Sequence, residues 1–250
     1  MLHDHMSGHS HWAGIKHKKA ITDAKRANVF TKFGRAISIA SREGGSNPET
    51  NWKLKLAIDQ AKSVNMPKEN IERAIKRGTG ELKGETVEEV IYEAYLPVQQ
   101  AGGSGQVAML IKTATDNKNR TLGELKNILT KAGGKLVPAG SVSYLFKQVG
   151  NINIPVGADE DPYELELKAI EAGAEDIIYS GGTLTVFTKS EELQKVKEHL
   201  EKHKVSIENA GLVFAPLQKI SLDQDTKLDY EKLLEALDNQ DDVQEIFDNL

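Results

Sequence analysis

The strongest constraint on the fold is a change in the spacing of apolar residues near Gly84. Before this point apolar residues recur at helical spacing, and the run from Val29 to Ala40 places its apolar side chains within about 100° of arc. After it, period-two runs typical of strands alternate with helical stretches. This order predicts an α+β protein with a helical N-terminal domain and two ferredoxin-like α/β domains, one inserted in the other.

The same patterns predict the domain boundaries. Residues 1–19 lack periodicity and are rich in His, Gly and Ser, so we expect a flexible basic arm. A three-helix basic domain is expected at 20–80, ending before a Gly-rich linker. The remaining chain is expected to form a discontinuous α/β domain from 81–138 and 206–250, around an inserted α/β domain at 139–205. Within the first of these, strands are predicted at Val87–Leu96 and Gln106–Thr115, on either side of a Gly102–Gly105 loop.

The charge is distributed unevenly along the chain. All 250 residues together carry 32 basic and 37 acidic side chains, and this net charge of −5 alone argues against a nucleic-acid partner. Residues 1–80, however, carry 15 basic and 7 acidic side chains, whereas residues 151–250 carry 9 and 23. Such an asymmetry indicates a basic part that meets nucleic acid, and an acidic part that can face a protein partner.

Several function classes are not favoured by the sequence. It contains no cysteine, which excludes disulfides, thiolate zinc sites and a cysteine nucleophile. No apolar run approaches the length of a membrane span and no secretory signal is recognisable, so we expect no membrane partner and a cytoplasmic location. No nucleophile, base and oxyanion hole can be assembled, so we expect neither enzymatic activity nor a cofactor. Five histidines lie in the first 17 residues without metal-ligand spacing, so we expect no metal site.

Basic residues cluster in the predicted arm and first helix, where Trp12 is placed to stack on an unpaired base. A second cationic string, Thr115–Thr121, lies where a strand leads into a helix and exposes backbone N–H groups to a phosphate. The alternatives are a solvated charged face for the arm and a simple N-cap for the string. The candidate nucleic-acid-binding residues are Trp12, Lys16, Lys18, Lys19, Lys25, Arg26, Lys32 and Arg35, with Lys76, Arg77, Lys118 and Arg120 as a secondary set.

Several strings, taken in order, resemble the YebC/PmpR family. The resemblance extends from about Ser7 to Leu250 and is carried by the succession of strings rather than by any one of them. They are Gly8-His9-Ser10-His11-Trp12, Ile15-Lys16-His17-Lys18-Lys19, Asp23-Ala24-Lys25-Arg26, Phe30-Thr31-Lys32, the run from Met66 to Lys76, Thr115–Thr121, Gly140-Ser141-Val142-Ser143 and Asp241-Asp242-Val243-Gln244.

This resemblance implies a cytoplasmic three-domain protein without known catalytic activity. Members of the family are described as DNA-binding transcriptional regulators. Others are described as ribosome-associated translation factors that bind rRNA and assist difficult stretches, such as proline-rich ones. Nothing in the sequence is a helix-turn-helix with clear base-reading side chains, so both DNA and ribosomal RNA stay open as targets.

Overall fold

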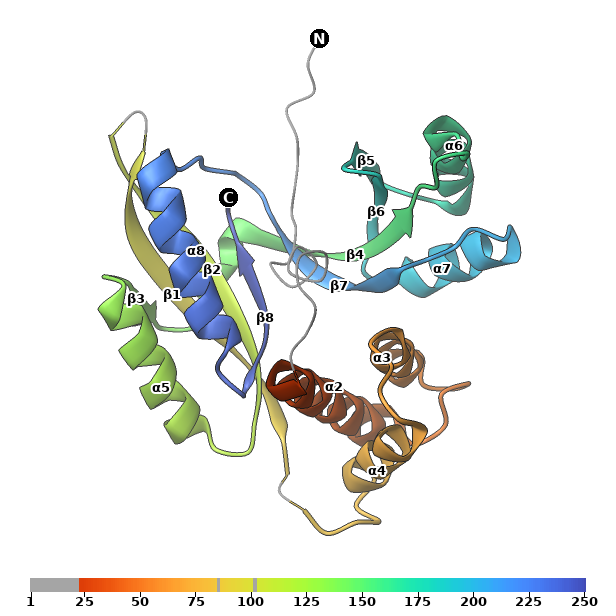
Figure 1. Cartoon of the computed structure of the whole chain (residues 1–250), viewed down its shortest axis with the longest axis horizontal. Helices are drawn as coiled ribbons and strands as arrows, with labels where there is room; N and C mark the ends of the chain where they lie inside the picture. Colours follow the sequence, from red (N-terminus) through yellow and green to blue (C-terminus); the bar gives the residue numbers. More distant parts are fainter. Residues whose placement is uncertain (1–22, 85, 101–102) are drawn as a thin grey trace. The chain divides into compact units, whose positions relative to one another are not determined.

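The computed structural model describes residues 23–84, 86–100 and 103–250 (Figure 1). This part of the chain contains seven α-helices, a short 3₁₀ helix and eight strands. One compact unit is formed by Gln148–Phe214, and the other by the described residues of Gly8–Lys147 together with Ala215–Leu250. Predictions that concern residues 1–22 lie outside the described residues.

Three helices begin the described chain: α2 (Asp23–Gly44), α3 (Trp52–Ser63) and α4 (Lys68–Gly78). They pack around a common apolar core because each carries an apolar stripe at helical spacing. From α2 the stripe contributes Phe33, Ile37 and Ala40, as the sequence predicts, and Leu54 and Ile71 join it from α3 and α4. Asn51 caps α3 by accepting a hydrogen bond from the backbone N–H of Leu54 (3.1 Å).

The C-terminal end of α4 lies directly against α2. The hydroxyl of Ser38 donates to the backbone O of Ala74 (2.8 Å), and the hydroxyl of Ser41 donates to that of Ile75 (3.3 Å). At Gly78 a Cβ atom would collide with both the Ser41 hydroxyl and the Ser38 carbonyl. Glycine is therefore required at this position for the close approach of the two helices, not for an unusual backbone angle.

The first sheet has the strand order β3-β1-β2-β8, and helices α5 and α8 cover one of its faces (Figure 1). Side chains that alternate along β1 and β2, such as Leu96, Val98 and Met109, pack there against Leu125 of α5 and Leu234 of α8. The elements are β1 (Glu88–Gln100), β2 (Gly103–Thr115), α5 (Lys118–Lys131), β3 (Lys135–Val137), the 3₁₀ helix η1 (Ser143–Leu145), α8 (Gln224–Asp238) and β8 (Val243–Asp248).

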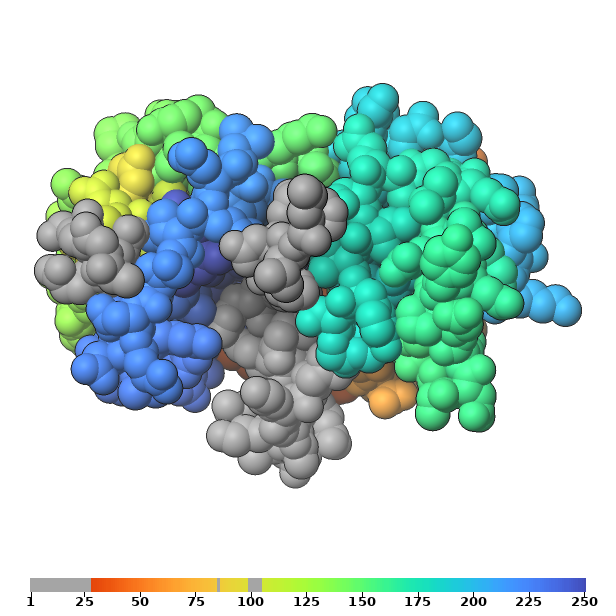
Figure 2. Space-filling model, turned by 90° about the horizontal axis from the view of Figure 1, so that it is seen from above, coloured from red at the N-terminus to blue at the C-terminus, as the bar shows by residue number. Residues whose placement is uncertain are grey.

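The second sheet has the order β5-β6-β4-β7, with α6 and α7 packed on it. The chain builds it in the order βαββαβ, which is the connection of a ferredoxin-like fold. Along α6, Tyr163, Leu167 and Ile170 are exposed and form a narrow apolar stripe, and residues of this helix form part of the surface seen in Figure 2. The elements are β4 (Phe146–Pro155), α6 (Pro162–Ala172), β5 (Asp176–Ser180), β6 (Thr183–Lys189), α7 (Leu193–Lys202) and β7 (Asn209–Pro216).

The predicted α+β class is confirmed, because the chain leaves the first sheet after β3, builds the second and returns as α8 and β8. Some details differ. The strands β1 and β2 pair as far as Gln100 and Gly103, so residues 103–105 of the predicted Gly102–Gly105 loop belong to β2. In addition, β7 is the neighbour of β4, whereas the sequence prediction grouped residues 206–250 with the other domain. Alternating apolar residues mark a strand but do not show which sheet it joins.

We expect Gly78→Ala to destabilise the unit that contains α2 and α4 by about 1–3 kcal/mol, because the added methyl group has no room. Gly123→Ala in α5 is the matched control, since a Cβ there meets no atom within 4 Å. Alanine is the better helix former, so the control should stabilise by about 0.5–1 kcal/mol. Urea unfolding followed by circular dichroism measures both. Equal effects of the two substitutions would contradict the close packing at Gly78.

Candidate nucleic-acid interface

A buried carboxylate, that of Asp242, joins two of the strings singled out in the sequence. Asp242 lies just before β8 and is 1% exposed. Its Oδ2 accepts a hydrogen bond from the hydroxyl of Thr121 (2.6 Å) and a longer one from that of Thr115 (3.3 Å). The string near the C-terminus therefore contacts the string at 115–121 directly, across the edge of the first sheet.

Two arginines complete this cluster. Arg35 from α2 places one guanidinium nitrogen 2.7 Å from Asp242 Oδ1 and 2.7 Å from the backbone O of Asp241. Arg120 from α5 lies 3.2 Å from Asp242 Oδ2 and 2.6 Å from Asp116 Oδ1. Burial opposes ionisation of Asp242, but the hydrogen bonds from Thr121 and Arg120 and the charge of Arg35 outweigh it and hold its pKa below the ordinary value.

A second cation of α2 is also bound by the C-terminal part of the chain. Lys32 is 5% exposed, and its Nζ donates to the backbone O of Asp238 (2.6 Å) and to its Oδ1 (2.9 Å). Lys32 and Arg35 thus hold α2 on the end of α8 and on the segment that leads into β8. Their predicted contact with phosphates stays a prediction, and it would require these intramolecular contacts to be shared or broken.

The N-terminus of α5 is capped by the chain itself. The side chain of Asn117 accepts from the backbone N–H of Arg120 (3.1 Å), and the Thr115 hydroxyl accepts from that of Asn117 (2.9 Å). Lys118 pairs with Glu88 at 2.6 Å, and this hydrogen bond with its accompanying charge raises the pKa of Lys118. A phosphate here would compete with these partners, so the role of Lys118 and Arg120 as its ligands stays a prediction.

The string Gly140–Ser143 also has a structural partner. The buried carboxylate of Glu93 accepts from the backbone N–H groups of Gly140 (2.7 Å), Val142 (2.6 Å) and Ser143 (3.2 Å). Burial opposes ionisation of Glu93, but these N–H groups lower its pKa overall. The residues of this string therefore have a structural role, because the Glu93 carboxylate fixes their loop to β1.

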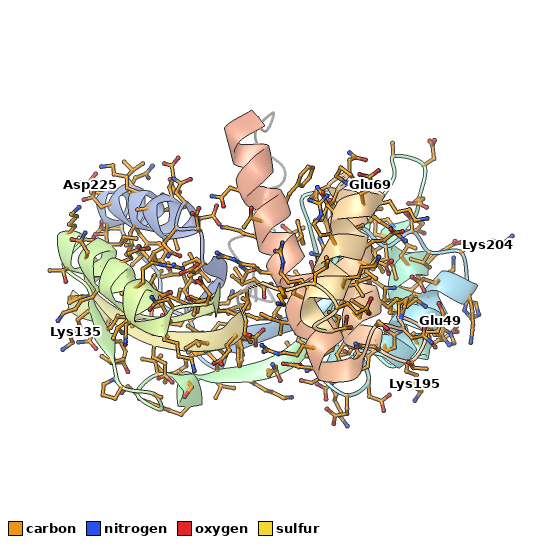
Figure 3. All side chains as sticks on the ribbon, turned by 90° about the horizontal axis from the view of Figure 1, so that it is seen from below. Glu49, Glu69, Lys135, Lys195, Lys204 and Asp225 are labelled. Carbon is orange, nitrogen blue, oxygen red and sulfur yellow. The ribbon has the colours of Figure 1, made fainter. Side chains whose placement is uncertain are left out.

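The remaining candidate residues fall into two groups. Lys76 and Arg77 are exposed in the last turn of α4, the helix whose Glu69 is labelled in Figure 3, and within the described part of the chain they form no ion pair. The others cannot be placed: Trp12, Lys16, Lys18 and Lys19 lie outside the described residues, as do the side chains of Lys25 and Arg26 in the first turn of α2.

Sequence reasoning missed that Asp238 and Asp242 are the partners of α2. They lie more than 200 positions from Lys32 and Arg35 in the chain. The signal in the sequence is the string Asp241-Asp242-Val243-Gln244, which belongs to the family resemblance but is not linked by the sequence to a basic helix.

We expect Asp242→Asn to destabilise the protein by about 3 kcal/mol, because it leaves Arg35 and Arg120 without their shared anion. Since the pKa of Asp242 is lower in the folded state, its contribution is present above the unfolded pKa of about 3.9 and is lost as the pH falls through the folded value. The stability difference between wild type and variant should therefore be constant above about pH 5 and shrink below about pH 4.

Urea unfolding midpoints across this pH range provide the measurement. Asp229→Asn is the control, because it removes a carboxylate from an exposed pair with Lys232 and should leave the midpoint nearly unchanged. A difference that persists undiminished into acid would show that Asp242 does not act as an anion in the folded protein.

Comparisons with known proteins cover nearly the whole chain. The family model for the TACO1/YebC protein N-terminal domain matches residues 10–81, and that for the TACO1/YebC second and third domain matches residues 87–250. A relative from Aquifex aeolicus, named probable transcriptional regulatory protein, is 49% identical over 245 residues, covering 98% of this chain and 95% of the relative. A relative of the same name from Persephonella marina is 48% identical over 249 residues, again covering 98% and 95%.

A solved structure agrees with these matches. The crystal structure of a conserved hypothetical protein from Aquifex aeolicus superposes with a TM-score of 0.84 at 48% identity, covering 96% of each chain. The two family models together span the helical part and both sheets described above. The chain therefore belongs to the TACO1/YebC family.

Proposed function

We propose that this protein is a non-enzymatic, nucleic-acid-binding regulator that acts on transcription by binding DNA in the cytoplasm. The observation that carries the proposal is the concentration of positive charge in residues 1–80, where 15 basic side chains face 7 acidic ones. Clustered Lys and Arg bind nucleic acid because they release the counterions condensed on its phosphates. The names of the relatives from Aquifex aeolicus and Persephonella marina agree with a regulatory role.

The ion pairs among the described residues support a choice between the candidate cations. In the described part of α2, Lys32 and Arg35 are engaged by Asp238 and Asp242. On α4, by contrast, the exposed Arg73, Lys76 and Arg77 form no ion pair with described residues. We therefore assign the first contacts to the basic residues 12–26 and to this face of α4, and a secondary role at most to the paired cations.

The acidic part of the chain is suited to a different class of partner from the basic part. Residues 151–250 carry 23 acidic and 9 basic side chains, so this part repels a polyanion and is suited to a basic protein partner. No helix among the described residues is long and apolar enough to cross a membrane. We accordingly propose nucleic acid and protein, and no membrane, as the partners.

A ribosome-associated translation factor is the second candidate. It is favoured because the available cations are suited to phosphate contacts, which fix the position of a protein on nucleic acid but do not read its sequence. Such contacts serve ribosomal RNA as well as they serve duplex DNA. In this form of the proposal the same basic residues bind rRNA, and the protein assists the translation of difficult, for example proline-rich, stretches.

We expect the protein to bind a duplex from a promoter that it regulates more tightly than a scrambled duplex of the same length and composition. Footprinting on the two duplexes and co-sedimentation with purified ribosomes, both at one fixed salt concentration, make the comparison. Association with ribosomes together with DNA binding that is indifferent to sequence would reject transcription and favour the translation factor.

Replacing Lys16, Lys18, Lys19 and Lys25 together by alanine should weaken binding to duplex DNA. It should also flatten the plot of log affinity against log salt by about three to four units, at roughly 0.9 per lost phosphate contact. The matched control removes four exposed lysines from the acidic part, Lys202, Lys204, Lys227 and Lys232. An unchanged salt slope in the first variant, or an equal change in the control, would refute the assignment of these residues.

A further inference from the structure

A polar pocket of about 350 Å³ lies where α2, the end of α4 and the linker to β1 come together. Three cationic side chains line it, one from each segment: Arg42 of α2, Arg77 of α4 and Lys83 of the linker. The sequence places Arg77 in the secondary set of candidate ligands and does not connect it with Arg42 or Lys83. Their convergence depends on the packing of α4 against α2 at Gly78.

None of the three cations forms an ion pair with a carboxylate among the described residues. Arg42 donates to the backbone O of Val87 (2.7 Å), which fixes its guanidinium beside the linker and leaves further N–H groups to donate. The neighbouring carboxylate of Glu88 is held by Lys118 at 2.6 Å. Among the described residues, Glu81 also adjoins the lining, and its carboxylate accepts a hydrogen bond from the Thr79 hydroxyl (3.0 Å).

The backbone carbonyls at the end of α4 also have partners. This end carries the negative pole of the helix dipole, equivalent to about half a charge, which would disfavour an anion. The carbonyl of Ile75 accepts from Thr79 N–H (3.0 Å) and that of Lys76 accepts from Leu82 N–H (3.1 Å), so these groups are satisfied within the linker. The positive charge of the three side chains therefore outweighs the partial negative charge that remains at this end of α4.

Glycines shape the wall of the pocket. Gly80 has a φ of +80°, a conformation that favours glycine. A Cβ at Gly84 would lie 3.3 Å from Cδ of Arg77, so the stem of Arg77 rests directly against the linker backbone. This contact orders a side chain that would otherwise be free at a helix end, and it reduces the entropy that anion binding would cost.

These features select one class of ligand. The volume is at the lower end of small-molecule sites, and the lining is polar and cationic rather than apolar. Guanidinium groups match the oxygens of phosphate in a two-pronged geometry, and the hydroxyl of Thr86 adds a donor. We propose that this pocket is a phosphate-binding site. If the phosphate belongs to a nucleic-acid backbone, this inference rests on the proposed function. A free nucleotide offers the same phosphate group.

The test uses the full chain, isotopically labelled, with inorganic pyrophosphate as the first probe. Two-dimensional amide NMR should show saturable shifts at Thr79, Gly80 and Gly84, which distinguishes the pocket from binding by basic residues elsewhere. Arg77→Ala and Lys83→Ala should each weaken this binding about tenfold, as expected for loss of a charge-assisted hydrogen bond. Arg77→Lys should retain part of it.

Two controls remove one positive charge outside the pocket. Lys62→Ala acts in the last turn of α3, and Lys135→Ala acts on β3, where Lys135 is labelled in Figure 3. Both should bind pyrophosphate as the wild type does. Absence of saturable shifts in the linker, or an equal loss in Lys62→Ala, would overturn the proposal, because binding would then follow the general charge rather than the pocket.

Adenosine monophosphate and a short oligonucleotide identify the source of the phosphate. If the backbone is the ligand, Arg77→Ala should weaken binding of the oligonucleotide and of pyrophosphate alike. If only the mononucleotide is affected, the site serves a free nucleotide. Failure of the proposed function has a different signature: the wild type would then bind pyrophosphate in the pocket but no polynucleotide at all.

Discussion

The ion cluster around Asp242 is the interaction on which the larger unit depends. A single buried carboxylate receives Arg35 from α2, Arg120 from α5 and the hydroxyl of Thr121. It therefore joins the helical part, the first sheet and the last strand, which the chain reaches only after completing the whole second sheet. Because a buried charge is costly unless its partners are all in place, the cluster favours one arrangement of these elements over looser alternatives.

This cluster also changes the meaning of the charge distribution. The sequence suggests a basic N-terminal part free to bind a polyanion and an acidic remainder that stays apart from it. In the structure, acids of the C-terminal segment neutralise Lys32 and Arg35, the two predicted ligands on the described part of α2. The positive charge that remains available belongs to other residues, such as those on the outer face of α4. The net charge of a segment thus indicates the class of partner. The ion pairs within the folded chain decide which cations are left to bind that partner.

Much of the fold follows from local patterns in the sequence. The stripe of Phe33, Ile37 and Ala40 predicts the buried side of α2, and the change of apolar period near Gly84 predicts where strands begin. What local patterns cannot supply is the identity of partners distant in the chain. Asp238 and Asp242 look like surface acids until α8 and β8 are folded, so Lys32 and Arg35 are read as free cations. The same limit applies to β7: its alternation marks a strand, but only its pairing with β4 assigns it to the second sheet.

The linker between α4 and β1 illustrates how such long-range effects create a site. As a sequence, Gly78-Thr79-Gly80 and Gly84 indicate only a flexible connection between domains. In the structure, the lack of a side chain at Gly78 lets α4 approach α2, and this approach brings Arg77 towards Arg42. Arg42 in turn holds the linker through Val87, so Lys83 is kept on the same side. The glycines therefore act by allowing close contact, and the positive pocket results from that contact rather than from a run of basic residues.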